Sequence, residues 1–215
     1  MNGLKFEDLK SWKRLSCLIA VFGGVFFIIT TIIAMIFYPG GYDFINHYFS
    51  NLGATKTLGT RQPNPISSFL FLLSCVIAGL SLIPFWIALT TLFSGKLITK
   101  IISYIGSIFG IIACPLLMGV GIFPTDTARV EHVFSARFFF LAFAAAILIY
   151  SIAILMNDDY QNIYSFIGII FSVFIVLFIF RVLDLINPLA QKIIVYGFVA
   201  WALIQIMKIW KIDDK

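Results

Sequence analysis

Charged side chains are scarce in this sequence of 215 residues. Asp, Glu, Lys and Arg make up 12% of it, about half the share found in ordinary soluble domains, while 61% of the residues are hydrophobic. A soluble domain with so little charge would expose large apolar surfaces to water, so the composition excludes that class. The chain is therefore expected to be an integral membrane protein.

Cysteine and histidine are also rare, which limits the chemistry available to the chain. Its three cysteines lie inside apolar stretches and form no CxxC pair, so we interpret them as buried thiols; they are Cys17, Cys75 and Cys114. The two histidines are His47 and His132. No HExxH motif or other tight ligand spacing surrounds them, and we assign no metal site.

Long apolar stretches dominate what is present. A helix needs about 20 mostly apolar residues to cross a hydrocarbon core of roughly 30 Å, because lipid offers backbone polar groups no partners. Six stretches meet this requirement: Ser16 to Tyr38, Ser67 to Phe93, Leu97 to Phe123, His132 to Met156, Ile163 to Val182 and Leu189 to Trp210. We predict an all-α fold, a polytopic membrane protein built as a bundle of six transmembrane helices.

The distribution of Lys and Arg predicts the orientation of this bundle. With the N-terminus in the cytoplasm, the cytoplasmic segments carry nine Lys and Arg residues and the outer segments carry six, as the positive-inside rule favours. We therefore expect both termini in the cytoplasm and the protein in the cell membrane. The net charge of +5 reflects these topology signals, and no nucleic-acid partner is expected.

The expected divisions follow from the spans. Residues 1–15 form a cytoplasmic amphipathic lead-in, residues 16–210 the transmembrane domain and residues 211–215 a cytoplasmic tail. Residues 39–66 form a long outer loop, in which glycine and proline recur between aromatic residues. A loop of this length in a compact domain is usually functional, so we expect a lid at the membrane interface with a short helix from Phe44 to Leu52.

The third apolar stretch contains small residues at helical spacing. Gly106 and Gly110 are four residues apart, and Pro115 follows them. Small residues let the backbones of membrane helices approach closely. We expect this helix to be central, to pack tightly against its neighbours and to be kinked at Pro115.

Polar residues gather at the outer ends of the predicted helices. Glu131, His132 and Ser135 open the fourth helix, and the spacing places Ser135 on a face with each of the other two. They either cap the helix among lipid head groups or form a site. Arg137 lies deeper, where a charge costs several kcal/mol unless it snorkels, pairs or meets water, so it is a candidate functional residue.

A second charged group lies near the outer end of the fifth helix, where Arg181 and Asp184 are three residues apart. These two residues either pair with each other or serve a ligand. In the second interpretation Arg137 and Arg181 hold an anion such as a lipid phosphate, Asp184 orients one of them and Glu131 contributes to the same binding site.

The candidate catalytic residues are His132, His47 and Ser135. Both histidines are assigned to the outer side, where they would handle protons or a divalent metal. The carboxylates available to complete such a metal set are Asp43, Glu131 and Asp184. Ser50 or Ser135 beside a histidine is a further alternative, although no strained nucleophile turn marks either serine. The sequence identifies neither a reaction nor a cofactor.

Three short motifs carry a resemblance to a known family. They are Ser50-Asn-Leu-Gly53, Asn64-Pro65, and Gly121-Ile-Phe-Pro124 followed by His132 and Ser135. Through them the chain resembles the bacterial and archaeal membrane proteins grouped as domain of unknown function 998. This resemblance covers all six predicted helices and implies a six-helix bundle. Family members typically have Asp where this chain has Asn51, which weakens any metal or acid–base role there.

The Frag, DRAM and Sfk membrane proteins are similar in layout and are linked with lipid handling, an analogy that favours a lipid role. We therefore expect an outward-facing polar pocket that binds or modifies a lipid head group, with membrane lipids as partners. A transporter is one alternative, but it requires polar residues near the bilayer midplane, where Gln205 and a few hydroxyl residues are all that the sequence offers. A structural or scaffold protein is another. The oligomeric state is not predicted.

Overall fold

The computed structural model describes residues 6–182 and 186–213, and the side chains of residues 11–182 and 186–211. The helices of these residues are α1 (Phe6–Ile36), α2 (Pro65–Leu89), α3 (Leu97–Ile122), α4 (Arg129–Leu155), α5 (Asn162–Ile179) and α6 (Asn187–Asp213), with two short 3-10 helices, η1 (Phe49–Gly53) and η2 (Thr90–Phe93). All six α-helices are long and apolar enough to cross a membrane. The predicted all-α fold with six spans is confirmed.

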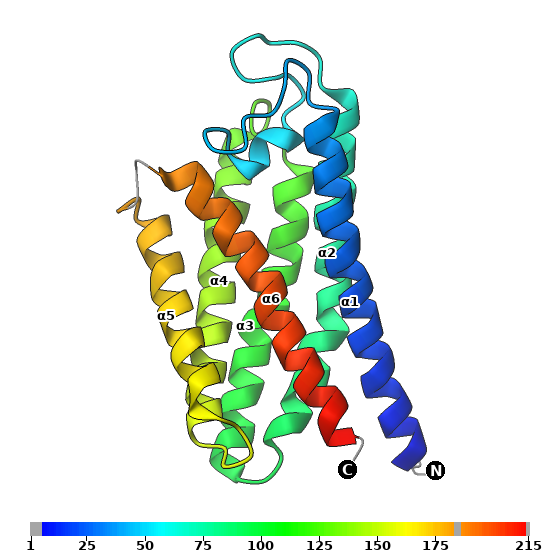
Figure 1. Cartoon of the computed structure of the whole chain (residues 1–215), viewed down its shortest axis with the longest axis vertical. Coiled ribbons are helices and arrows are strands. Elements are labelled where there is room, and N and C mark those ends of the chain that lie inside the picture. Colours follow the sequence, from blue (N-terminus) through cyan, green and yellow to red (C-terminus); the bar gives the residue numbers. More distant parts are fainter. Residues whose placement is uncertain (1–5, 183–185, 214–215) are drawn as a thin grey trace.

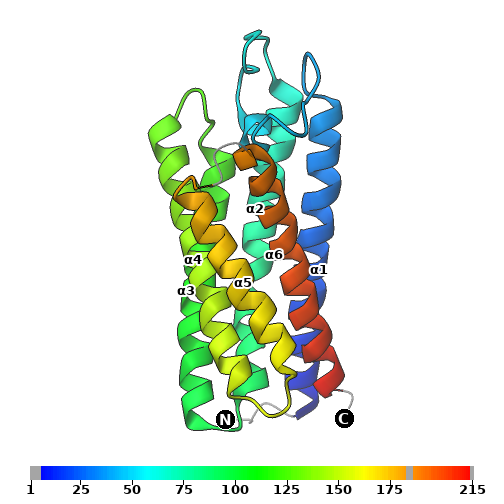
Figure 2. The same ribbon diagram turned by 60° about the vertical axis from the view of Figure 1, so that its left-hand side comes forward.

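The helices form one elongated bundle. α1 to α5 pack against one another in chain order, and α6 crosses the bundle diagonally, in contact with α1 and α5 (Figure 1). The start of α1 and the end of α6 lie at one end, whereas the connection between α1 and α2 covers the other end (Figures 1 and 2). We call residues 37–64 the first loop and the end that they cover the loop end.

Aromatic rings fill the space beneath α6. Phe198 of α6 stacks on Phe143 of α4 with ring centroids 4.0 Å apart, and Trp86 of α2 lies 5.8 Å from Trp201 of α6. Large rings therefore separate the backbone of α6 from those of α2 and α4, and the helices contact one another here through side chains.

Glycines on α3 make room for two of these rings. A Cβ atom at Gly110 would lie 2.2 Å from the Trp86 ring, and one at Gly106 would lie 2.9 Å from the Tyr150 ring. Both distances are shorter than van der Waals contact, so only glycine fits at these positions. The tight packing expected of the third helix is confirmed, and its partners are aromatic side chains of α2 and α4.

The helix in the first loop is shorter than the sequence predicted. The expected helix from Phe44 to Leu52 is replaced by η1, which begins at Phe49. Asp43 explains the late start, because its Oδ1 accepts hydrogen bonds from the backbone N–H groups of Ile45 and Asn46 at 2.9 and 3.0 Å. Such a side-chain turn competes with helix formation over these residues. The residues of η1 are buried, so this part of the loop belongs to the bundle.

Candidate functional site

A cavity of about 890 Å³ opens at the loop end, between the first loop, α4, the end of α5 and the start of α6. We call it the polar pocket. Five of its lining side chains are cationic, namely Lys56, Arg61, Arg129, Arg137 and Arg181, and one, Asp126, is a carboxylate. An excess of positive charge around one concave space attracts anions, because the individual fields add within it.

α4 supplies two of these cations from one face. Arg129, Val133 and Arg137 are four residues apart, lie one above another on the helix, and all line the polar pocket. Arg137 is one of the lining residues and its side chain is exposed. Its guanidinium therefore keeps access to water or to a ligand at a depth where lipid would offer neither.

Arg61 and Arg181 hold an unusual backbone conformation. Their φ angles are +56° and +59°, and no other described residue except glycine has a positive φ. At the end of α5, Arg181 N–H donates to Phe178 O and Val182 N–H donates to Leu177 O, both at 3.0 Å. These two hydrogen bonds form a Schellman motif, which ends the helix and in which glycine normally occupies the position of Arg181. A side chain there costs roughly 1 kcal/mol, so helix termination alone does not account for the arginine.

His132 lies buried in the wall of the polar pocket. Its Nδ1 is 2.8 Å from the carbonyl oxygen of Phe123 at the end of α3. Because a carbonyl only accepts hydrogen bonds, Nδ1 carries the proton and donates it. This bond fixes the orientation of the ring and ties α4 to α3. Ser135 is also buried and also faces the end of α3, where a Cβ atom at Gly119 would lie 2.6 Å from its Oγ, but it does not line the polar pocket.

His47 does not line the polar pocket. Its ring packs between those of Tyr38 and Tyr42, at centroid distances of 5.7 and 5.5 Å. Its Nδ1 accepts a hydrogen bond from Asp43 N–H at 3.2 Å. Tyr42 O–H donates to the carbonyl oxygens of His47 and Tyr48 at 3.2 and 3.1 Å, and burial raises the pKa of Tyr42, which keeps this donor protonated. His47 thus packs within the first loop.

Lys192 of α6 fastens this part of the loop. Its fully buried ammonium group donates to the carbonyl oxygens of His47 and Pro188. The Nζ atom also lies 5.5 Å from the centroid of the Tyr42 ring and 5.2 Å from that of Phe44. A cation gains from both kinds of contact, which offset the cost of removing it from water. The sequence indicated only a positive charge near a helix end.

Asp126, in the turn between α3 and α4, fastens the other side of the loop. Its carboxylate accepts hydrogen bonds from Thr55 N–H at 2.9 Å, Thr55 Oγ1 at 2.6 Å and Lys56 N–H at 3.0 Å. Burial opposes ionisation, but these bonds outweigh it and lower the pKa of Asp126. The one carboxylate in the pocket lining is therefore engaged by the loop.

Two buried amides of α6 complete the lining. Gln191 Oε1 accepts a hydrogen bond from Phe49 N–H at 2.7 Å, and Asn187 Nδ2 donates to Tyr48 O–H at 3.2 Å. Asn187 Oδ1 is buried and has no hydrogen-bond partner among the described residues. An unpaired buried acceptor is costly unless a ligand or water donates to it. Sequence reasoning missed both amides, although their four-residue spacing at the start of an apolar helix was a signal.

The remaining candidate residues do not join this group. Glu131 is exposed on the first turn of α4 and is not among the lining residues. Asp184 lies outside the described residues. Within residues 6–182 and 186–213, no three His, Cys, Asp or Glu side chains come together as a metal site. The polar pocket therefore brings together His132, Arg137 and Arg181 from the predicted set, with Lys56, Arg61 and Arg129 added.

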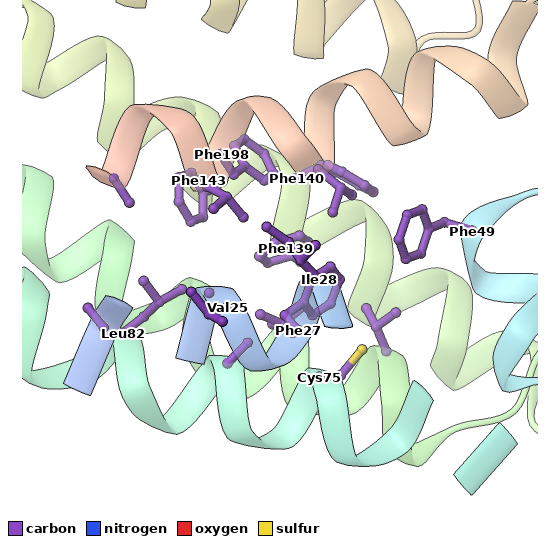
Figure 3. A pocket seen from close by; sticks show the side chains of 18 of the residues that line it. Val25, Phe27, Ile28, Phe49, Cys75, Leu82, Phe139, Phe140, Phe143 and Phe198 are labelled. Carbon is purple, nitrogen blue, oxygen red and sulfur yellow. The ribbon is translucent and has the colours of Figure 1, made fainter. Parts of the chain in front are cut away.

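An apolar cavity of about 130 Å³ lies beneath the polar pocket. Its walls come from α1, α2, α3, α4, α6 and η1, and phenylalanine rings dominate them, with Phe139, Phe140 and Phe143 on α4 facing Phe27 on α1 and Phe198 on α6 (Figure 3). Ser50, Ala136, Phe140 and Gln191 line both cavities. The two spaces therefore meet at the level of η1.

Comparison with known proteins gives one match. A family model described as "Protein of unknown function (DUF998)" matches residues 21–208, which cover all of α2 to α5, the second half of α1 and most of α6. No curated protein and no solved structure shows significant similarity to this chain.

Proposed function

Because this chain belongs to the DUF998 family of proteins of unknown function, we propose a function from its own geometry: it binds an anionic lipid head group in the polar pocket. Arg137 and Arg181 are the residues proposed to contact the anion. The observation that carries this proposal is the pocket lining, in which five cationic side chains face one space with a single, already engaged carboxylate.

The depth of the polar pocket matches a lipid head group. Arg129 opens α4, Arg137 lies about two turns further along it, and Arg181 follows the end of α5. The ends of membrane-spanning helices lie in the interfacial region, where lipid phosphates are found. Arginine suits this ligand, because its planar fork binds two phosphate oxygens at once.

The neutral groups of the lining favour a head group that also carries a donor. Asn187 Oδ1 accepts no hydrogen bond from the described residues, and a hydroxyl on the head group would pair with it. The anion and the donor would then be recognised by different walls of the pocket, α4 and α5 on one side and α6 on the other.

A transporter is the alternative that the sequence left open. It needs polar groups along a path through the bilayer, but the cavity below the polar pocket is lined almost entirely by apolar side chains. Gln205, the candidate midplane residue, accepts a hydrogen bond from Tyr160 O–H at 3.1 Å. These features favour binding at one interface over passage across the membrane.

The proposal is tested by thermal unfolding of the full chain in a neutral detergent, with short-chain lipids added. Dihexanoyl phosphatidate should raise the Tm in a concentration-dependent way, because a ligand that binds only the folded state stabilises it. Dihexanoyl phosphatidylcholine, which is zwitterionic, should raise it less. Added salt should reduce the rise in Tm caused by phosphatidate, since ions in solution screen the attraction between its phosphate and the cationic side chains. Equal shifts with both lipids, or no shift with phosphatidate, would overturn the proposal.

A further inference from the structure

The apolar cavity is long and narrow. Its lining residues on α6 run from Gln191 to Ile206, roughly 22 Å at about 1.5 Å per residue, yet its volume is only about 130 Å³. A compact cavity of about 150 Å³ in a protein core accommodates a benzene ring. A slightly smaller volume spread along such a wall can take part of one hydrocarbon chain and leaves no room for two parallel chains.

The cavity reaches the membrane-facing surface between α1 and α6. Val25 of α1 and Leu203 of α6 line it and are also 49% and 39% exposed. Gly24 of α1 lies at the same seam, where a Cβ atom would be 3.5 Å from Val199 Cγ1 of α6. Because Gly24 carries no side chain to close this seam, it is the point at which a chain from the bilayer would enter the cavity.

Water is a poor occupant of this space. Ser50 and Gln191 supply the polar oxygen and nitrogen side-chain atoms of the lining, both at its junction with the polar pocket. A buried water needs two to four polar partners, and apolar cavities stay dry without them. Below Ser50 and Gln191, only hydrocarbon matches the walls.

Hydrophobic transfer alone would not draw a lipid chain out of the bilayer, because lipid tails are already in an apolar medium. Two other effects favour entry. Filling the cavity restores dispersion contacts that its phenylalanine walls otherwise lack. Binding of the head group in the polar pocket also raises the effective concentration of the attached chain at the cavity.

We propose that one acyl chain of the anionic lipid bound in the polar pocket enters between α1 and α6 and lies in the apolar cavity. This inference rests on the proposed function and adds the site of the lipid chain. It makes the two cavities a single amphipathic site, whose polar and apolar parts meet at Ser50 and Gln191 in the same order as a lipid's head group and chain.

Photo-crosslinking tests the inference directly. The full chain is reconstituted in phosphatidylcholine nanodiscs with a trace of phosphatidate that carries a diazirine in one acyl chain, and labelled peptides are mapped by mass spectrometry. Label is expected on the cavity-lining segments 139–143 of α4 and 198–203 of α6. Labelling confined to outward residues such as Ile193 and Met207, which are 50% and 56% exposed, would overturn the inference.

Variants at the seam provide the matched comparison. Gly24→Phe should fill the entrance and lower labelling of the cavity segments about tenfold, whereas Gly24→Ala should retain it, since its Cβ makes ordinary contact. Ala202→Leu, which fills the cavity from α6, should act like Gly24→Phe. Unchanged labelling in both filled variants would contradict chain entry by this route.

Two further measurements separate this inference from the proposed function. The Tm shift with glycerol 3-phosphate, which carries the phosphate and no acyl chain, should be the same in Gly24→Phe as in the unchanged protein, because it tests the polar pocket alone. If glycerol 3-phosphate shifts the Tm but the long chain never labels the cavity, only the chain inference fails. If a diazirine phosphatidylcholine labels the cavity as strongly as phosphatidate does, the link to the polar pocket fails.

Discussion

Arg61 in the first loop and Arg181 at the end of α5 line the same pocket and share a left-handed backbone, with φ angles of +56° and +59°. The conformation costs roughly 1 kcal/mol at each residue, and glycine would remove the cost. Both conformations are therefore kept at a cost in stability, at two positions that line the polar pocket.

Replacing Arg181 separates stability from binding. Arg181→Gly is expected to be more stable than Arg181→Ala by about 1 kcal/mol, because only glycine relieves the left-handed backbone. Both variants should bind dihexanoyl phosphatidate about tenfold more weakly than the unchanged protein, the loss expected for one charge-assisted hydrogen bond. Thermal unfolding with and without the lipid measures both effects. Unweakened binding in both variants would remove Arg181 from the site.

Lys192 is predicted to anchor the first loop to α6. Lys192→Met removes the donor to the carbonyl oxygens of His47 and Pro188 and should accelerate amide hydrogen exchange in residues 42–48 about tenfold, the effect of losing roughly 1.5 kcal/mol of local stability. Lys208→Met is the control. Lys208 is on α6 like Lys192, but its ammonium group lies over the rings of Tyr160 and Tyr164, and this part of α6 is toward the opposite end of the bundle. Equal exchange rates in the two variants would contradict the anchoring role.

Asp126 should make the other loop attachment depend on pH. Its pKa is lower in the folded protein, so the attachment has full strength above the unfolded value of about 3.9 and is lost as pH falls through the lowered value. At neutral pH, Asp126→Asn should speed amide exchange at Thr55 and Lys56 about tenfold. At pH values below the lowered pKa, the ratio of the two rates should approach one. A ratio that does not change with pH would show that the charge is irrelevant.

Glycine packing predicts two different responses to alanine. Gly110→Ala should destabilise the protein by about 1–3 kcal/mol or more, because the new Cβ would overlap the Trp86 ring, which is enclosed by other aromatic side chains. Gly24→Ala should leave stability nearly unchanged, since its Cβ would meet only Val199 at 3.5 Å. The Tm of each variant in detergent tests this contrast. Equal losses of stability would show that the seam between α1 and α6 is packed more tightly than described.

The sequence predicted the helices well because each apolar run is long enough to cross the hydrocarbon core, where lipid offers the backbone no partners and only a helix satisfies its hydrogen bonds. It also predicted that Arg137 and Arg181 lie at the same end of the bundle, which follows from counting spans. That they line one pocket depends on how α4 and α5 pack, and no pattern in the sequence specifies this packing.

The first loop is where sequence reasoning was weakest. The positions of His47 and Lys192 depend on contacts between residues far apart in the chain, and a turn around Asp43 replaced the expected helix. Lys56, Arg61 and Arg129 were interpreted as topology signals, because a charge near a helix end has that role whether or not it also faces a cavity. The spacing of Gln191 and Asn187 marked them as a pair, but their contacts with Phe49 and Tyr48 depend on how α6 packs over η1, which the sequence does not specify.

The central claim, that the polar pocket binds an anionic head group through its arginines, is tested most directly by comparing two variants that each lose one positive charge. Arg137→Gln removes a lining cation, and Lys100→Gln removes an exposed one on α3, near its start at the opposite end of the bundle. Titration of dihexanoyl phosphatidate should give about tenfold weaker binding for Arg137→Gln and wild-type binding for Lys100→Gln. Equal affinities for both variants and the unchanged protein would contradict the account.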